Sequence, residues 1–202
     1  GEDKIILNYF KKKKKGFYVD VGCYHPLVGS NTHLLYKKKW NGINIDVNAL
    51  SIDLFKRARK EDDNLNLAIS NTKKKIKLYF RKEINMLNTI NKQYAKMHFK
   101  KGFNEKVVDC NTLDSVLKSS NYNNKQIDFL NLDVEGNELN VLKSLNFRKY
   151  NPKLICVEIH NYTNISKKKK NTFKNNTNFK FLYKKKYRII WNNGFSYIFK
   201  KV

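Results

Sequence analysis

Acidic side chains stand at or near the ends of four short apolar segments of this 202-residue chain. The segments have the Val, Ile and Leu content of parallel strands covered on both faces, where an unpaired carboxylate is costly. In open α/β folds the carboxyl ends of such strands border the ligand crevice. The acids therefore predict a ligand site at one edge of a sheet, and they are Asp20, Asp46, Asp133 with Glu135, and Glu158.

The first segment, GFYVDVG (16–22), runs into a polar turn that indicates the kind of ligand. Gly22 permits close backbone approach, and the helix start at Asn31 and Thr32 offers free N–H groups. The turn has neither a G-x-G-x-x-G fingerprint nor the Gly-Lys-Ser/Thr ending of a phosphate loop, so no pyrophosphate site is predicted. Asp46 ends the next segment, where an acid accepts hydrogen bonds from both ribose hydroxyls. A nucleoside without a phosphate chain fits these features, and S-adenosylmethionine is the common one.

Predicted strands and helices alternate along the chain, which indicates an α/β fold with a mainly parallel sheet and helices on both faces. We expect helix caps at Ser30 or Asn31, at Ser51 and at Thr112. Two final strands around a turn at 192–194 predict an antiparallel C-terminal hairpin. Strands are expected over 16–22, 42–48, 64–70, 126–136, 152–160, 178–191 and 194–202, with an extra hairpin strand over 73–80, and helices over 32–40, 52–60, 112–119 and 137–145.

Length and composition favour one domain over residues 1–202, with 41% hydrophobic residues to form its core. Residues 81–106 show no clear period, and we interpret them as a substrate-covering loop within that domain. No apolar run approaches the roughly 20 residues that cross a bilayer. Three scattered cysteines suggest neither a disulfide framework nor a zinc knuckle. We therefore expect a soluble cytoplasmic protein, although the chain starts at Gly1 and an upstream targeting segment is compatible with it.

The net charge of +25 favours polyanions such as nucleic acid, anionic glycans or lipid headgroups. Lysine, however, occurs in homopolymeric runs among many Asn, Ile, Tyr and Phe residues, a mixture typical of A/T-rich coding bias. We favour the second interpretation, because charge blocks are commonly solvated faces.

The chain resembles the FkbM-type S-adenosylmethionine-dependent methyltransferases over residues 16–160. The resemblance rests on FYVDVGCYHPLVGSNTHLLYKKKWNGINIDVN, LNLAIS, NTLDSVL, IDFLNLDVEGNELNVLKSL and PKLICVEIH, of which IDFLNLDVEG is the most specific. It implies a Rossmann-like, seven-stranded class I methyltransferase sheet whose last strand is antiparallel. It also implies O-methylation of a sugar hydroxyl on a glycan, a glycolipid or a glycosylated metabolite.

The resemblance also implies roles for individual residues. Asp20 and Gly22 belong to the cofactor turn and Asp46, with Val47 beside it, to the ribose contact. Ala68 and Ile69 lie beside the adenine, while Asp133 and Glu135 face the methyl group and the acceptor.

Methyl transfer to oxygen requires an acceptor held about 3 Å from the methyl carbon and a group that takes the hydroxyl proton. Asp133 and Glu135 lie two apart, as do Glu158 and His160, so each pair would share a face of a strand. We expect Asp133 or His160 as the general base, with Glu135 and Glu158 orienting the acceptor. The same acids could bind a divalent metal, but we assign none.

Other functions remain open. An RNA methyltransferase is suggested by the charge, and it should place a lysine among the catalytic acids, which is not seen here. A non-enzymatic polyanion-binding module with a vestigial pocket is opposed by the intact acids. An NAD-dependent dehydrogenase lacks its glycine fingerprint. The identity of the acceptor and the oligomeric state are not predicted.

Overall fold

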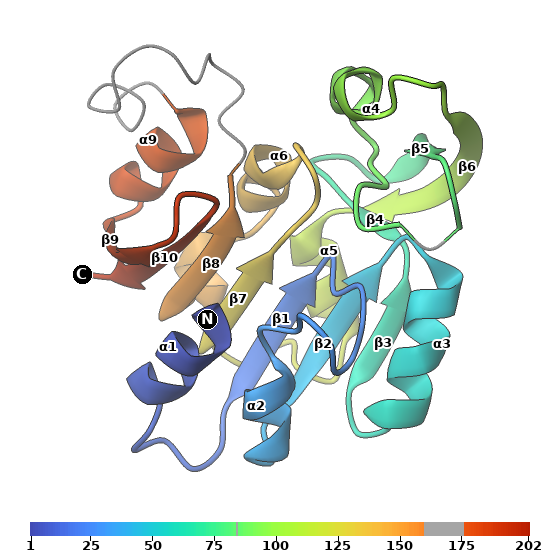
Figure 1. Cartoon of the computed structure of the whole chain (residues 1–202). Coiled ribbons are helices and arrows are strands. Elements are labelled where there is room, and N and C mark those ends of the chain that lie inside the picture. The colour runs from blue at the N-terminus through green and yellow to red at the C-terminus, as the bar shows by residue number, and fades with distance from the viewer. Residues whose placement is uncertain (84, 160–175) are drawn as a thin grey trace.

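The computed structural model describes residues 1–83, 85–159 and 176–202, and its central feature is a seven-stranded sheet. The strand order is β3-β2-β1-β7-β8-β10-β9 (Figure 1). The first five of these are parallel neighbours, and β10 runs antiparallel to both β8 and β9. The predicted mixed α/β sheet with an antiparallel C-terminal hairpin is confirmed. Its strands are β1 (Phe17–Val21), β2 (Asn41–Asp46), β3 (Asp63–Asn66), β7 (Phe129–Leu132), β8 (Leu154–Glu158), β9 (Tyr187–Asn192) and β10 (Ser196–Lys201).

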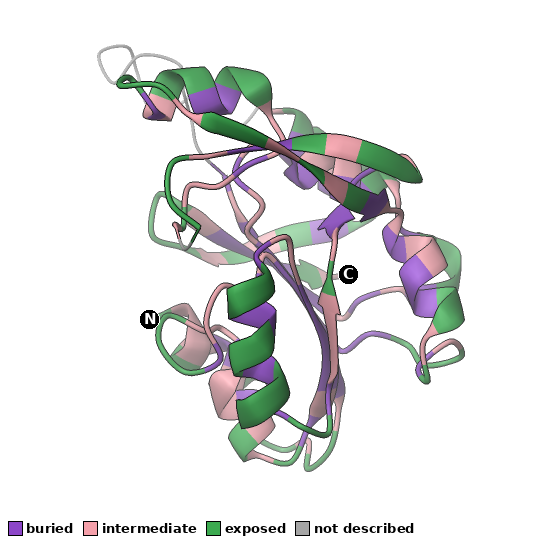
Figure 2. Ribbon diagram, turned by 90° about the vertical axis from the view of Figure 1, so that its right-hand side faces the viewer, coloured by how far each residue is buried: buried purple, intermediate pink, exposed green. Residues whose placement is uncertain are grey.

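Helices cover both faces of this sheet because its strands alternate two sets of apolar side chains. Phe17, Val19 and Val21 share a buried cluster with residues of α5, α6 and α9, whereas Tyr18 belongs to the cluster under α1 and α2. The sheet strands are accordingly mostly buried, while the outer faces of the helices are exposed (Figure 2). The helices are α1 (Glu2–Tyr9), α2 (His33–Lys37), α3 (Ala49–Ala58), α4 (Lys92–His98), α5 (Leu113–Ser119), α6 (Glu138–Lys143), α7 (Phe147–Tyr150) and α9 (Thr177–Lys184).

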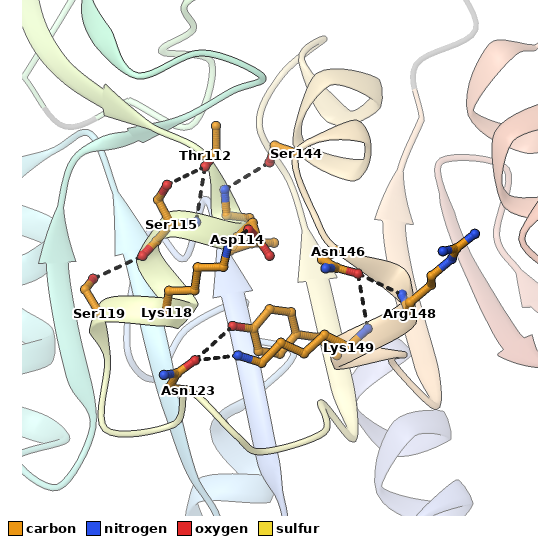
Figure 3. A network of polar contacts seen from close by, with 12 residues as sticks. Thr112, Asp114, Ser115, Lys118, Ser119, Asn123, Ser144, Asn146, Arg148 and Lys149 are labelled. Atoms are coloured by element: carbon orange, nitrogen blue, oxygen red, sulfur yellow. Dashed lines mark hydrogen bonds and ion pairs between the residues drawn. The ribbon is translucent and has the colours of Figure 1, made fainter.

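Three predicted helix caps had different outcomes. Thr112 caps α5 as predicted, because its hydroxyl accepts from the Ser115 N–H at 3.1 Å (Figure 3). The cap of α3 is Asn48 rather than Ser51, since the Asn48 side chain accepts from the N–H groups of Leu50 and Ser51. For α2, neither Ser30 nor Asn31 is the cap: the helix begins after Thr32, which makes no side-chain capping bond.

Two predicted strands were wrong in extent. Residues 178–191 do not form one strand, because 177–184 is the helix α9, capped by Asn176 and buried through Phe179 and Leu182. The spacing of these two apolar residues suits a helix, and only 187–192 joins the sheet as β9. The strand expected over 126–136 is shorter, since β7 ends at Leu132. The acids after it therefore lie on a turn.

A second, three-stranded sheet lies over the carboxyl ends of β2 and β3 (Figure 1). It has the order β4 (Ala68–Ile69), β6 (Asn104–Asn111) and β5 (Lys74–Phe80). The extra strand predicted over 73–80 exists as β5, but its antiparallel partner β6 was not predicted. The expected loop 81–106 contains α4 and the start of β6. Part of this segment is therefore regular secondary structure, and it lies beside the carboxyl ends of β2 and β3.

Candidate active site

A cavity opens at the carboxyl edge of the large sheet, beside the neighbouring ends of β1 and β7. This is the point where the strand order reverses, which is where open α/β sheets bind ligands. The cavity has about 690 Å³ of empty space, part of it open to solvent. Six residues predicted for the site line it: Gly22, Asp46, Val47, Ala68, Ile69 and Asp133.

Gly22 directly follows β1 and packs against Asp133, the residue after β7. It has a positive φ of 78°. A Cβ at this position would lie 1.7 Å from the carbonyl oxygen of Asp133, far inside contact distance. The Asp133 N–H meanwhile donates to the carbonyl of Val21 at 2.9 Å. The sequence predicted a glycine for the approach of a ligand, and the structure shows that the protein's own backbone already requires it.

Asp46 is the last residue of β2 and presents its carboxylate to the cavity. Its Oδ1 accepts from the Asn48 N–H at 2.8 Å and its Oδ2 from the Tyr24 N–H at 2.9 Å. Burial outweighs these hydrogen bonds and raises the pKa of Asp46 to about 6. Because a carboxylate has about four acceptor positions, each oxygen retains capacity for one more donor, such as a ribose hydroxyl.

An apolar part of the cavity adjoins Asp46. Ala68 and Ile69 of β4 and Leu78 of β5 are buried there, and the lining also includes Ser51 at the start of α3. An apolar wall with a few polar groups suits a planar heterocycle such as adenine. The small sheet therefore supplies a wall that the parallel strands alone do not.

Asp133 follows β7 directly and lies within a group of acids. Burial, and then the neighbouring carboxylates of Glu158 and Glu135, raise the pKa of Asp133 well above its usual range. The buried Oδ1 of Asp133 has no hydrogen-bond partner among the described residues, and an interaction with the Glu158 side chain contributes to the raised pKa of Asp133. The pair can therefore hold a proton at the cavity wall.

Asp20 is not among the residues that line the cavity. Successive side chains of β1 point to opposite faces of the sheet, so Val21 lines the cavity while Asp20 faces the α2 side. The residue is only 1% exposed. Its carboxylate accepts from the Thr32 hydroxyl at 2.7 Å and from the Asn131 amide at 2.8 Å. Asn31 donates in turn to Asn131 at 3.0 Å. The predicted cofactor residues Asp20, Asn31 and Thr32 thus form one buried network that supports the turn.

Arg59 completes this network and was not predicted as a site residue. It follows α3, is fully buried, and donates to Thr32 at 2.8 Å and to Ser30 at 2.8 Å. Its guanidinium also donates to the carbonyl of Pro26, which fixes the middle of the β1–α2 loop. One signal for Arg59 is present in the sequence: it shares the buried face of α3 with Ile52 and Phe55, where an arginine needs polar partners.

Glu135 does not share a strand face with Asp133, because the turn gives Glu135 a positive φ of 52°. Its buried carboxylate accepts from the Tyr94 hydroxyl of α4, and its carbonyl accepts from the Thr89 hydroxyl at 2.7 Å. Asn91 donates to the next carbonyl, Gly136, at 2.9 Å. These three bonds clamp the segment 89–94 to the turn after β7, so Glu135 positions the wall of the cavity.

We expect Tyr94→Phe to lower the free energy of unfolding by about 1–3 kcal/mol, because a buried carboxylate loses a hydroxyl donor. Urea unfolding measures the change. The matched control is Tyr183→Phe, on an exposed tyrosine, with an expected change within about 0.5 kcal/mol. Equal effects of the two substitutions would contradict the clamp.

Two predicted site residues, Glu158 and His160, remain. Glu158 is the last residue of β8 and acts on the cavity through its proximity to Asp133. His160 lies outside the described residues. The sequence did not single out Tyr24 or Asn48, which also line the cavity. For the lining residues within 85–90 it predicted only a covering loop over 81–106, since no period marks that segment. Among the described residues no three side chains are placed to hold a metal ion.

The seven-stranded sheet has an antiparallel last strand, and the cavity at its switch point has an acid at the end of β2. Together these features define a class I methyltransferase architecture. The sequence model of the methyltransferase FkbM domain matches residues 20–196. The chain therefore belongs to the FkbM methyltransferase family. Comparison with curated proteins gave no match, and neither did comparison with solved structures. None of the helices in the described ranges is long and apolar enough to span a membrane.

Proposed function

We propose that the chain is an S-adenosylmethionine-dependent O-methyltransferase that acts on a sugar hydroxyl of a glycan, a glycolipid or a glycosylated metabolite. Asp46 carries the proposal, because a half-buried carboxylate with spare acceptor capacity lies at the end of β2 and beside an apolar slot. Family membership supports the methyl donor. The sugar acceptor rests on the resemblance to the FkbM-type enzymes. We further propose that residues 1–202 act as one domain, since one buried cluster joins residues from Phe17 to Phe199.

The cofactor would be held by three parts of the cavity. Asp46 would accept hydrogen bonds from the ribose hydroxyls, and Ala68 and Ile69 would contact the adenine. The backbone at Gly22 would lie along the rest of the cofactor. When bound, S-adenosylmethionine supplies an electrophilic methyl group on a sulfonium. The buried network of Asp20, Thr32 and Arg59 would act indirectly, by fixing the β1–α2 loop.

Asp133 is the proposed general base. In an in-line displacement the acceptor oxygen forms a bond to the methyl carbon while the carbon–sulfur bond breaks, and the hydroxyl proton passes to a nearby base. The raised pKa of Asp133 gives it a higher affinity for a proton than an ordinary aspartate has, which favours proton uptake. The carboxylate of Glu158, which neighbours Asp133, would help to hold that proton. Glu135 would act indirectly, because its bond to Tyr94 holds the segment 89–94 against the turn after β7.

Titration calorimetry with S-adenosylhomocysteine tests the cofactor site. We expect micromolar binding to the native chain, with affinity falling by up to about tenfold per pH unit below pH 6, as Asp46 becomes protonated. The direction follows from the charge: ribose hydroxyls donate to the ionised carboxylate. Asp46→Asn should weaken binding at pH 7.5 by about tenfold and remove this pH dependence.

Asp53→Asn is the control. Asp53 lies on α3, the helix that follows Asp46 in the chain, but it is exposed and pairs with Lys56. It should bind like the native chain. No binding by a folded native chain would refute the proposed function. Binding with the same pH dependence in Asp46→Asn would refute the ribose contact.

A further inference from the structure

Lysine side chains gather at the amino ends of the parallel strands, at the opposite edge of the large sheet from the cavity. Figure 1 shows the segment before β1 at the lower end of the strands, whereas the cavity opens at their upper, carboxyl ends. The antiparallel β10 ends at the same lower edge, because its Lys200 pairs with the first residue of β8. We call these lysines the basic face: they are the lysines of 11–15, 37–39, 184–186 and 200–201, together with Lys153.

Contacts between distant segments join these lysines in one surface. The Lys38 ammonium, just after α2, donates to the carbonyl of Phe10 at 3.0 Å and to that of Lys11 at 3.2 Å. The Lys200 ammonium, near the end of β10, lies 5.9 Å from the centre of the Tyr9 ring. The first lysine run therefore lies beside both the end of α2 and the end of β10.

The surface continues from there toward β9. Lys13 and Lys153 both bind Oδ1 of Asp128, at 2.6 Å and 2.8 Å. The Lys201 N–H donates to the carbonyl of Lys153 at 3.0 Å, and its ammonium donates to the carbonyl of Lys185 at 2.6 Å. Several ammonium groups are thus held in place by oxygen atoms of the protein itself.

Most of the charge on this face has no acidic partner nearby in the chain. The segments 9–16, 37–40, 184–187 and 199–202 contain no acidic residue. Exposed lysines that pair with no carboxylate among the described residues are Lys11, Lys12, Lys14 and Lys15. Burial, and then the charges of Lys186 and Lys185, lower the pKa of Lys201. These ammonium groups therefore repel one another, and a bound anionic surface would relieve that repulsion.

The residue types favour anionic lipid over nucleic acid. The face is built of lysines, with Arg188 beside the run 184–186, whereas arginine makes the paired phosphate bonds typical of nucleic-acid recognition. Tyr9 and Tyr183 are exposed next to lysine runs, and a cation lies over each ring, Lys200 over Tyr9 and Arg188 over Tyr183. Tyrosine suits the headgroup region of a membrane, because its ring is apolar and its hydroxyl is polar.

The extent of the face supports the same choice. Lys38 precedes β2 and Lys185 precedes β9, so the lysines extend over most of the width of the sheet. A broad array of charges matches a plane of headgroups, whereas a nucleic-acid strand is usually held in a groove that follows its backbone.

We infer that the basic face binds an anionic lipid membrane surface. In this orientation the amino ends of the parallel strands face the headgroups, and the cavity at their carboxyl ends opens away from the bilayer. The inference does not rest on the proposed function, because the cavity lining includes no residue of the basic face within the described ranges.

Co-sedimentation of the full chain with lipid vesicles tests the inference. The vesicles are phosphatidylcholine alone, and phosphatidylcholine with about 30% phosphatidylserine. In about 0.1 M NaCl we expect binding to the anionic vesicles to be at least about tenfold stronger than to the neutral ones. In about 0.5 M NaCl most of this binding should be lost, since salt screens exposed charges.

Two sets of substitutions on the basic face should weaken binding to the anionic vesicles. The first set is Lys11→Gln, Lys12→Gln, Lys14→Gln and Lys15→Gln, with an expected loss of at least about tenfold. The second set is Lys184→Gln, Lys185→Gln and Lys186→Gln, from a distant segment of the same face, with an expected loss of at least about fivefold. All of these side chains are exposed, so the variants should fold like the native chain.

The matched control removes the same charge as the first set from exposed lysines at or near the small sheet. Its substitutions are Lys73→Gln, Lys74→Gln, Lys75→Gln and Lys101→Gln. Binding should fall by no more than about threefold. If the control weakened binding as much as the first set, net charge alone would explain the attraction and the inference would be overturned.

Three other outcomes would also overturn the inference. The native chain could bind neutral and anionic vesicles equally. An RNA oligonucleotide, at a phosphate concentration equal to that of the accessible phosphatidylserine, could release most of the chain from the vesicles. S-adenosylhomocysteine could bind in solution but not on the vesicles, which would place the cavity against the bilayer. A chain that binds the anionic vesicles through this face, but binds no S-adenosylhomocysteine in solution, supports the inference and refutes the proposed function alone.

Discussion

Gly22→Ala should lower the free energy of unfolding by about 3 kcal/mol or more and abolish cofactor binding. Two costs add at this position. The positive φ of 78° is strained for any residue with a Cβ, by about 1–2 kcal/mol. The new Cβ would also lie 1.7 Å from the Asp133 carbonyl oxygen, so β1 and β7 must separate at the cavity. Urea unfolding and calorimetry with S-adenosylhomocysteine measure the two effects.

Gly29→Ala separates the clash from the backbone strain. Gly29 also has a positive φ, of 68°, but a Cβ there meets nothing within 4 Å. This variant should lose only about 1 kcal/mol. If the two alanine variants lost the same stability, the close approach of Gly22 to β7 would not be the reason for the glycine.

Arg59→Met should also cost about 3 kcal/mol or more. The substitution removes a buried guanidinium that donates to Thr32, to Ser30 and to the carbonyl of Pro26. It also removes the positive charge near the buried carboxylates of Asp20 and Asp62. We expect a loosened β1–α2 loop, seen as weaker S-adenosylhomocysteine binding together with lower stability. Arg57→Met, on an exposed arginine near the end of α3, should change stability by no more than about 0.5 kcal/mol.

The pH dependence of Arg59→Met gives a second readout. Burial raises the pKa of Asp20 and of Asp62, while the Arg59 charge opposes that rise. Without Arg59 both values rise further, so the folded state binds more protons than the unfolded chain over a wider range. The stability lost relative to the native chain should therefore grow as the pH rises from about 4 to about 7. A deficit independent of pH would show that Arg59 acts by packing alone.

The sequence by itself determined the class of fold and the edge where the site lies. Alternating apolar strands and amphipathic helices predict a parallel sheet, because each element must bury one apolar face. Acids at strand ends predict a ligand edge, because such groups are costly in the core. These signals are local, and Asp46 and Asp133 line the cavity accordingly. Ala68 and Ile69, which the family resemblance implies, also line it.

Only the tertiary structure decided which acids face the cavity. Asp20 and Asp46 look alike in sequence, but Asp20 is one residue before the end of its strand and faces α2, where a hydroxyl and an amide enclose it. Glu135 turns toward Tyr94 because β7 ends at Leu132 and the backbone there has a positive φ. A difference of one residue in the position where a strand ends changes which way such side chains face. The end of a strand is set by long-range pairing rather than by local pattern.

The small sheet is the clearest example of that dependence. The pairing of β5 with β6 joins segments separated by α4, and it brings Leu78 and the residues of 85–90 against the end of β2. The sequence predicts β5 but not β6, because Cys110 is the one fully buried residue of β6 and the strand has no clear apolar face. The sequence thus determined the sheet edge at which the candidate site of this methyltransferase lies. The folded chain determined the walls that enclose that site, because those walls exist only through contacts between distant segments.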